Sequence, residues 1–196
     1  MNERTWQWLA GSAGMLLSLA LASPAQAGSA AMVVTQTLTK GTCTIDSTAT
    51  AGIALGDVKQ TVFDSNDIAA AKSAGQTFAV NLNCTGAPNP SDTNVLKIGG
   101  TADGADGSHK LFKNLSTGGS AATHLGFLLT ANDTSGTGVP LDTSSLPVSV
   151  DVGGAGDNVD GRAVNFYVMP SKGNYAYKDV TAGALTTTLT FTWDTR

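Results

Sequence analysis

Charge of either sign is scarce in this 196-residue chain, because Asp, Glu, Lys and Arg together make up only 13% of it. The net charge is −4, and the few basic residues do not cluster. Nucleic acid and anionic membrane surfaces, which attract basic patches, are therefore disfavoured as partners. Aromatic residues are also few, but the 41% of hydrophobic residues suffices for the core of one domain.

Residues suited to catalysis or metal binding are equally sparse. His109 and His124 lack zinc-site spacing, and no cysteine is left over to complete such a site. The segment TADGADG at 101–107 lacks the alternating ligands and terminal Glu of a calcium loop, so a plain turn is favoured. There is no G-x-S-x-G motif, and no pair of acids stands out. The sequence predicts no enzyme, no metal site and no cofactor.

After the first 27 residues the chain has no long apolar run. Within them, Arg4 precedes an apolar stretch at 9–22, and SPAQA ends in an A-x-A site at Ala27. This pattern predicts a signal peptide over 1–27 and export. The alternative is an uncleaved anchor, but the apolar stretch is shorter than the ~20 residues of a membrane span.

The two cysteines, Cys43 and Cys84, are the only ones in the chain. In an exported protein such a pair predicts a disulfide, and two free buried thiols are the alternative. We expect a location in the periplasm or at the cell surface.

The remaining sequence alternates short strand patterns with turns rich in Gly, Asp, Asn and Pro. Strands are expected at 33–45, 52–58, 77–84, 95–98, 125–129, 146–152, 163–169 and 185–193, and a helical turn at 68–74. The last of them is strictly periodic, with Leu185, Thr187, Leu189, Phe191 and Trp193 on one face and threonines on the other. These patterns predict an all-β sandwich of one domain.

Several segments, in order, resemble a chaperone-usher fimbrial subunit, a pilin of the type 1 fimbrial protein kind. In the first half they are CTID, ALGDV and FAVNLNC, with a cysteine spacing near forty. In the second half they are LKIGGTAD, LGFLL, GVPLD, VNFYVMP and VTAGALTTTLTFTW. The resemblance covers essentially the whole chain after the signal peptide.

The resemblance implies an immunoglobulin-like β-sandwich that lacks its final strand and is completed by a donor strand. The pilin domain would span 40–196, with an apolar groove beside its C-terminal strand at Leu185, Leu189, Phe191 and Trp193. It implies that a periplasmic chaperone fills this groove first, that an outer-membrane usher exports the subunit, and that a neighbouring pilin subunit then supplies the strand.

The expected donor segment is the N-terminal extension at 28–39. Its alternating face carries Ala30, Met32, Val34 and Leu38, interrupted by Gln36. The alternative is the first strand of a closed sandwich, because alternation alone does not separate the two. Related extensions usually carry Gly near the position of Val34 and Gln36.

The C-terminus departs from the family pattern as well. Related chains commonly end one residue after a Tyr, whereas Asp194, Thr195 and Arg196 follow Trp193 here. The resemblance implies a structural subunit of a cell-surface fimbria that supports cell adhesion. The alternatives are a one-domain adhesin or minor tip subunit that binds a host receptor, and a secreted sandwich enzyme, which the missing catalytic groups disfavour.

Overall fold

A computed structural model describes residues 29–36, 43–49, 52–64, 69–85 and 91–196. The expected signal peptide and Leu38 lie outside these residues. The described chain is built from strands and short 3-10 turns, which confirms the all-β prediction. No helix in the described ranges is long and apolar enough to cross a membrane.

The strands are β1 (Ser29–Gln36), β2 (Cys43–Ser47), β3 (Ile53–Asp57), β4 (Ala69–Ala70), β5 (Gln76–Cys84), β6 (Thr93–Gly99), β7 (Phe112–Lys113), β8 (Gly126–Ala131), β9 (Val148–Ala155), β10 (Ala163–Gly173) and β11 (Leu185–Thr195). The 3-10 turns are η1 (Gln60–Phe63), η2 (Lys72–Ala74) and η3 (Tyr177–Asp179).

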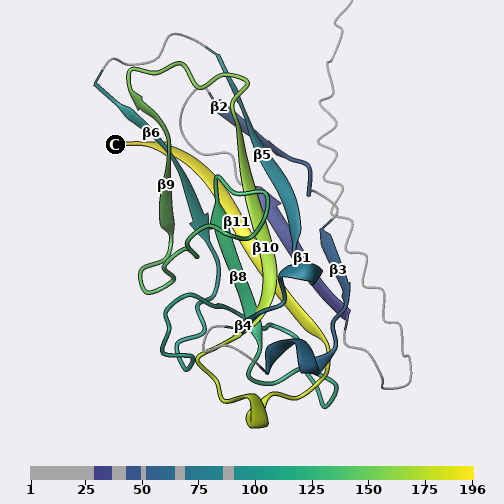
Figure 1. The fold of residues 1–196 in the computed structure, drawn as a ribbon. Helices are drawn as coiled ribbons and strands as arrows, with labels where there is room; N and C mark the ends of the chain where they lie inside the picture. The colour runs from purple at the N-terminus through teal and green to yellow at the C-terminus, as the bar shows by residue number, and fades with distance from the viewer. Residues whose placement is uncertain (1–28, 37–42, 50–51, 65–68, 86–90) are drawn as a thin grey trace, which may run out of the picture.

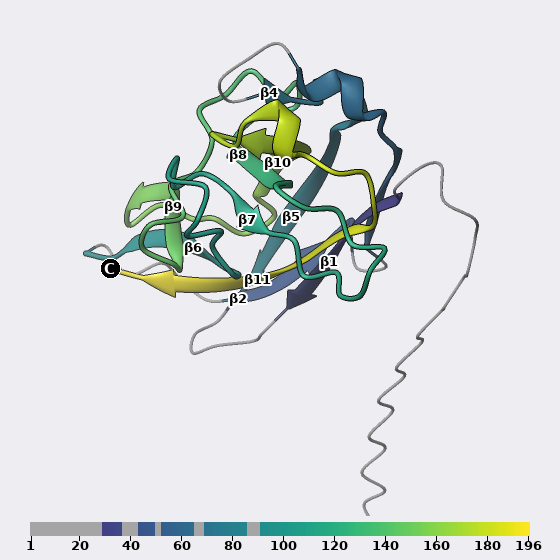
Figure 2. The same ribbon diagram turned by 90° about the horizontal axis from the view of Figure 1, so that it is seen from below.

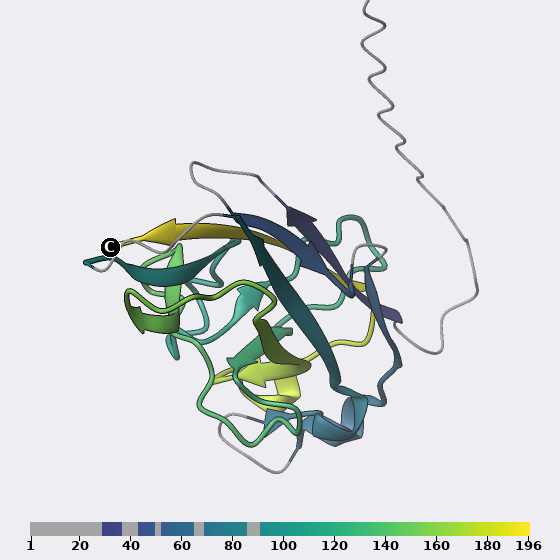
Figure 3. The ribbon, with the colours of Figure 1, turned by 90° about the horizontal axis from the view of Figure 1, so that it is seen from above.

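Two sheets face each other, as the turned views show (Figures 2 and 3). One has the order β3-β1-β11-β6-β9, and the other has the order β2-β5-β10-β8-β7, with β4 paired to β10. The arrangement is a sandwich of the immunoglobulin-like kind, as predicted. The long strand β11 lies in the first sheet between β1 and β6 and runs diagonally across the view in Figure 1.

The core lies between the sheets and is centred on three phenylalanines. Phe78 of β5 stacks on Phe166 of β10 with ring centroids 5.4 Å apart, and Phe191 of β11 approaches them at 5.8 and 5.2 Å. Such aromatic contacts add to the free energy of burying the rings. Phe191 therefore ties the first sheet to the second.

Two expectations about local structure need correction. The segment 33–45 is not one strand, because β1 belongs to the first sheet and β2 to the second, and β1 already begins at Ser29. Of the segment 68–74, the described residues 69–74 are mostly not helical. Residues 69–70 form β4 against β10, and only η2 at Lys72–Ala74 makes a turn.

The cysteine pair joins two neighbouring strands. Cys43 and Cys84 face each other where β2 begins and β5 ends, and they form a disulfide 41 residues apart in sequence. The predicted disulfide is confirmed. It holds the start of the expected pilin domain to the sheet.

Candidate functional site: the slot between β3 and β11

The first sheet contains a slot between β3 and β11, and β1 occupies it. β1 runs parallel to β11, from Ala30 opposite Leu185 to Gln36 opposite Phe191. On its other side it runs antiparallel to β3, with an irregularity between Ala30 and Ala31. Both edges of the slot are thereby paired, which removes two exposed strand edges.

The inner face of β11 forms the floor of the slot. Leu185, Leu189, Phe191 and Trp193 are all buried, as their alternation predicts. Thr187 is also buried, at 1% exposure, and its Oγ1 has no hydrogen-bond partner in the described structure. Thr187 thus places one polar group in an otherwise apolar row, and it was not among the expected groove residues.

The burial of two neighbouring side chains shows which face of β1 points into the core. Met32 is fully buried in the core, whereas Val33 is 51% exposed. β1 thus alternates between the inner and the outer side of the sheet at these two positions. In register, Ala30, Val34 and Gln36 lie opposite Leu185, Leu189 and Phe191.

Gly52 is a slot residue that the sequence reasoning missed. It has a φ of +89°, and a Cβ placed on it would lie 3.0 Å from the carbonyl oxygen of Met32. The glycine thus serves both a left-handed turn and the close approach of β1. The sequence signal for it is an Ala-Gly step immediately before an apolar strand.

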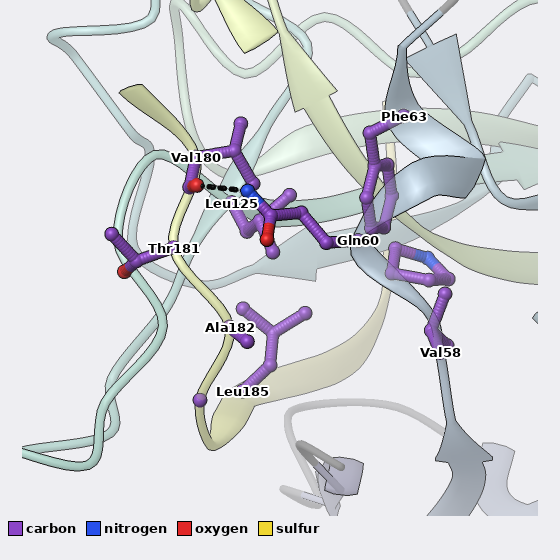
Figure 4. A pocket seen from close by; sticks show the side chains of 10 residues that line it. Val58, Gln60, Phe63, Leu125, Val180, Thr181, Ala182 and Leu185 are labelled. Atoms are coloured by element: carbon purple, nitrogen blue, oxygen red, sulfur yellow. Dashed lines mark hydrogen bonds between the residues drawn. The ribbon is translucent and has the colours of Figure 1, made fainter. Parts of the chain in front are cut away.

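A small pocket opens where β3 ends and β11 begins (Figure 4). Val58, Phe63, Val180 and Leu185 give it apolar walls. The side-chain amide of Gln60 donates a hydrogen bond of 2.6 Å to the carbonyl oxygen of Val180 across it. β1 starts at this end of the slot, since Ser29 lies opposite Asp57.

The opposite end of the slot holds the C-terminal residues. β11 continues past Trp193 to Thr195, and the backbones of Arg196 and Thr93 exchange hydrogen bonds of 2.8 and 3.0 Å. Lys97 pairs with Asp194, and Arg196 pairs with Asp151 at 2.8 Å. The three residues after Trp193 therefore extend the sheet.

Within the single chain, residues 29–36 of the chain itself fill the slot. Alternation sets which side chains point inward but not which chain supplies the strand. The pilin domain still lacks a strand of its own after residue 43, and the extension completes it.

Ionisable groups with shifted pKa values lie in loops away from the slot. Burial raises the pKa of Asp133, but hydrogen bonds from Thr130, Ser135 and Gly138 outweigh it and hold this pKa far below its usual range. Burial and a hydrogen bond to Asp103 raise the pKa of Tyr175. These groups stabilise loops.

Of the two histidines, His124 contacts neighbouring residues and His109 lies in a loop. His124 Nδ1 lies 2.7 Å from the carbonyl oxygen of Asp179, and its ring meets that of Tyr175 edge-on at 4.7 Å. His109 lies in the loop after TADGADG, where Asp106 accepts a hydrogen bond from the Ser108 amide. Within the described ranges, no three potential metal ligands come together.

The fold and slot define an immunoglobulin-like β-sandwich whose sheet is completed by an N-terminal extension. The chain belongs to the fimbrial protein family, since the family model "Fimbrial protein" matches residues 32–195. No individual curated protein matches it significantly. Membership makes it a fimbrial subunit of a structural, generally non-enzymatic family, and it implies a cell-surface fimbria in which it associates with other pilin subunits.

Proposed function

We propose that this chain is a structural subunit of a chaperone-usher fimbria that assembles by donor-strand exchange and supports cell adhesion. The observation that carries the proposal is the position of β1 between β3 and β11. Without β1, the domain from Cys43 onward has two strand edges and an apolar floor exposed in the middle of one sheet. Such a gap requires a strand from somewhere.

A second copy supplies the same strand chemistry as the chain itself. Backbone hydrogen bonds to β3 and β11 depend on strand geometry, and the apolar row of β11 accepts any matching alternate side chains. Every copy has both an extension and a slot. Exchange between copies therefore forms a head-to-tail contact that repeats into a fibre.

A periplasmic chaperone is the proposed first occupant of the slot. Strand addition by a chaperone to a pilin is an established form of β-augmentation. Filling the slot in this way keeps Leu189 and Phe191 out of water and prevents the chain's own β1 from closing it. An outer-membrane usher then brings the extension of the next subunit to the slot.

The test uses two adjacent valines of β1. Val34→Asp puts a charge two positions from the buried Met32, where burial costs several kcal/mol unless the charge is paired. Val33→Asp is the matched control, because Val33 is exposed. Each variant is coexpressed with the chaperone and usher and viewed by electron microscopy.

We expect Val33→Asp to form fibres and Val34→Asp to form none, while both still copurify with the chaperone. Phe191→Asp, which damages the slot itself, should lose the chaperone complex as well. Normal fibres from Val34→Asp would refute the donor role of the extension.

A further inference from the structure

The strand β9 is an outer strand of the first sheet and pairs with β6. No other strand of the described chain lies along its far side. An outer strand presents unpaired N–H and C=O groups to which a further strand can add. A chain whose proposed function is to receive a strand in its slot therefore needs a way to keep strands off this edge.

The second half of β9 departs from regular pairing. The register of β6 with β9 shifts between Thr93 and Val95. Residues 152–154 of β9 consequently lie opposite Asn94 alone. Such a bulge bends the strand and interrupts the ladder of hydrogen bonds. A straight incoming strand therefore meets a regular edge only over the first half of β9, at 148–151.

Two side chains, the edge caps Arg162 and Asp157, bind backbone groups of the bent half. The guanidinium of Arg162 donates a hydrogen bond to the carbonyl oxygen of Val152. The carboxylate of Asp157 accepts a hydrogen bond of 2.7 Å from the N–H of Gly154. Each edge cap thereby takes up one backbone group that a partner strand would use.

The first edge cap, Arg162, reaches β9 from the opposite sheet. Its backbone carbonyl oxygen accepts a hydrogen bond of 2.9 Å from the N–H of Leu82 in β5. The N–H of the preceding Gly161 donates a bond of 2.8 Å to the carbonyl oxygen of Leu82. The backbone of Arg162 is thus fixed to the second sheet, while its side chain spans to the edge of the first.

The second edge cap, Asp157, belongs to a tight turn that packs over the end of β9. Its N–H donates a hydrogen bond of 3.2 Å to the carbonyl oxygen of Gly154, whose N–H its carboxylate binds. A Cβ placed on Gly153 would lie 2.8 Å from Cγ1 of the buried Val159. The turn therefore lies against the strand, while Asp157 itself is exposed.

The other outer strand of the first sheet, β3, has a contact of the same kind. The side-chain amide of Gln76 in β5 donates a hydrogen bond of 2.8 Å to the carbonyl oxygen of Ala54. Side chains anchored on the second sheet thus bind backbone groups at both outer strands of the first. The slot, in contrast, lies inside this sheet.

We propose that Arg162 and Asp157 keep a second copy of this chain from pairing along β9, and so confine strand addition to the slot. The inference rests on the proposed strand exchange. The excluded occupant is the β9 strand of another copy, since two identical edges can pair antiparallel across a two-fold axis. In a fibre every subunit carries the same edge, so pairing there would join fibres side by side.

The experiment compares Asp157→Ala/Arg162→Ala with the control Asp64→Ala/Lys178→Ala. Each double variant removes one charge of either sign at exposed positions, so the net charge is unchanged. Arg162→Ala alone, which keeps the turn at Asp157, tests the same edge with less change to the loop. The oxidised chain from residue 28 onward, purified without chaperone, is studied by sedimentation equilibrium, and thermal unfolding verifies that each variant is folded.

We expect the parent and the control to remain monomers. The average mass of Asp157→Ala/Arg162→Ala should rise with concentration toward that of a dimer, and Arg162→Ala should show a smaller rise. Adding Ser149→Lys on the exposed face of β9 should restore the monomer, because like charges meet in a two-fold contact. Folded variants that stay monomeric would overturn the inference, as would association that Ser149→Lys does not reverse.

Fibres give the second measurement. Coexpressed with chaperone and usher, Asp157→Ala/Arg162→Ala should form fibres that lie in side-by-side bundles, whereas the control should form separate fibres. Separate fibres from both would count against the edge caps and leave strand exchange standing. Failure of the parent to form fibres would contradict strand exchange, while sedimentation still decides on the edge caps.

Discussion

Met32→Ala tests whether the extension is an integral part of the free chain. Met32 is fully buried by the core between the sheets, although it lies in a segment that precedes the disulfide-bonded domain. Truncation of a buried Met to Ala removes its apolar contacts and leaves a cavity. The expected loss in the free energy of unfolding is about 2–5 kcal/mol.

The size of the loss has an upper bound set by β1. If β1 with the truncated side chain leaves the slot while the rest of the sandwich stays folded, the loss in the free energy of unfolding cannot exceed the free energy with which β1 docks. For a chain of this length, each kcal/mol corresponds to roughly 2–4 °C in melting temperature. We therefore expect the melting temperature to fall by roughly 4 °C or more.

The assay is thermal unfolding and, in parallel, urea unfolding of the oxidised chain from residue 28 onward, purified without chaperone. Trp193 is the only tryptophan after residue 27 and lies in the slot floor, so its fluorescence reports on the relevant strand. Val33→Ala is the control, since Val33 is exposed and its truncation should cost no more than about 0.5 kcal/mol. Equal effects of the two substitutions would refute the packing of β1 in its own domain.

Two further predictions concern the rest of the domain. Replacing both Cys43 and Cys84 by Ala removes a cross-link that spans 41 positions, and should lower the free energy of unfolding by about 4 kcal/mol in the chain-entropy account; an unchanged urea midpoint would contradict this. Asp133→Asn should cost about 1–3 kcal/mol, because the carboxylate accepts hydrogen bonds from Thr130, Ser135 and Gly138, whereas the exposed Asp64→Asn should cost little. The folded pKa of Asp133 lies below its unfolded value, so the stabilisation by this carboxylate is fully present above about pH 4 and is lost as the pH falls through the folded pKa. In strong acid, the free energies of unfolding of Asp133→Asn and of the parent chain should therefore converge.

Sequence alternation was sufficient for the parts of the fold that are governed by one buried face. The inner row of β11 could be predicted residue by residue, since strand parity decides burial directly. The disulfide followed from the number of cysteines and the expected export. Strand ends were less well defined, because β10 runs to Gly173 and β11 to Thr195, beyond the expected ends at 169 and 193.

The occupant and direction of the strand in the slot could not be predicted in the same way. The alternation of Met32 with Val33 fits a strand that runs parallel or antiparallel to β11, and it fits a strand of the same chain or of a second copy. The role of Gly52 could not be predicted, because it depends on the backbone of Met32, which is distant in sequence but is paired with the neighbouring Ile53 in the sheet. Thr187 belonged to the periodic row, but its missing hydrogen bond shows only in three dimensions.

The last two strands of the chain, β10 and β11, are the middle strands of their sheets. A chain that emerges N-terminus first from a translocation channel therefore presents its outer strands before the strands that join them. The second sheet cannot close before β10 has emerged, and the first cannot close before β11 has emerged, so a product truncated before β11 has no slot floor to offer an incoming strand. If the subunit assembles as proposed, a chain truncated before β11 would lack the strand that receives its neighbour, and would be left out of the fibre.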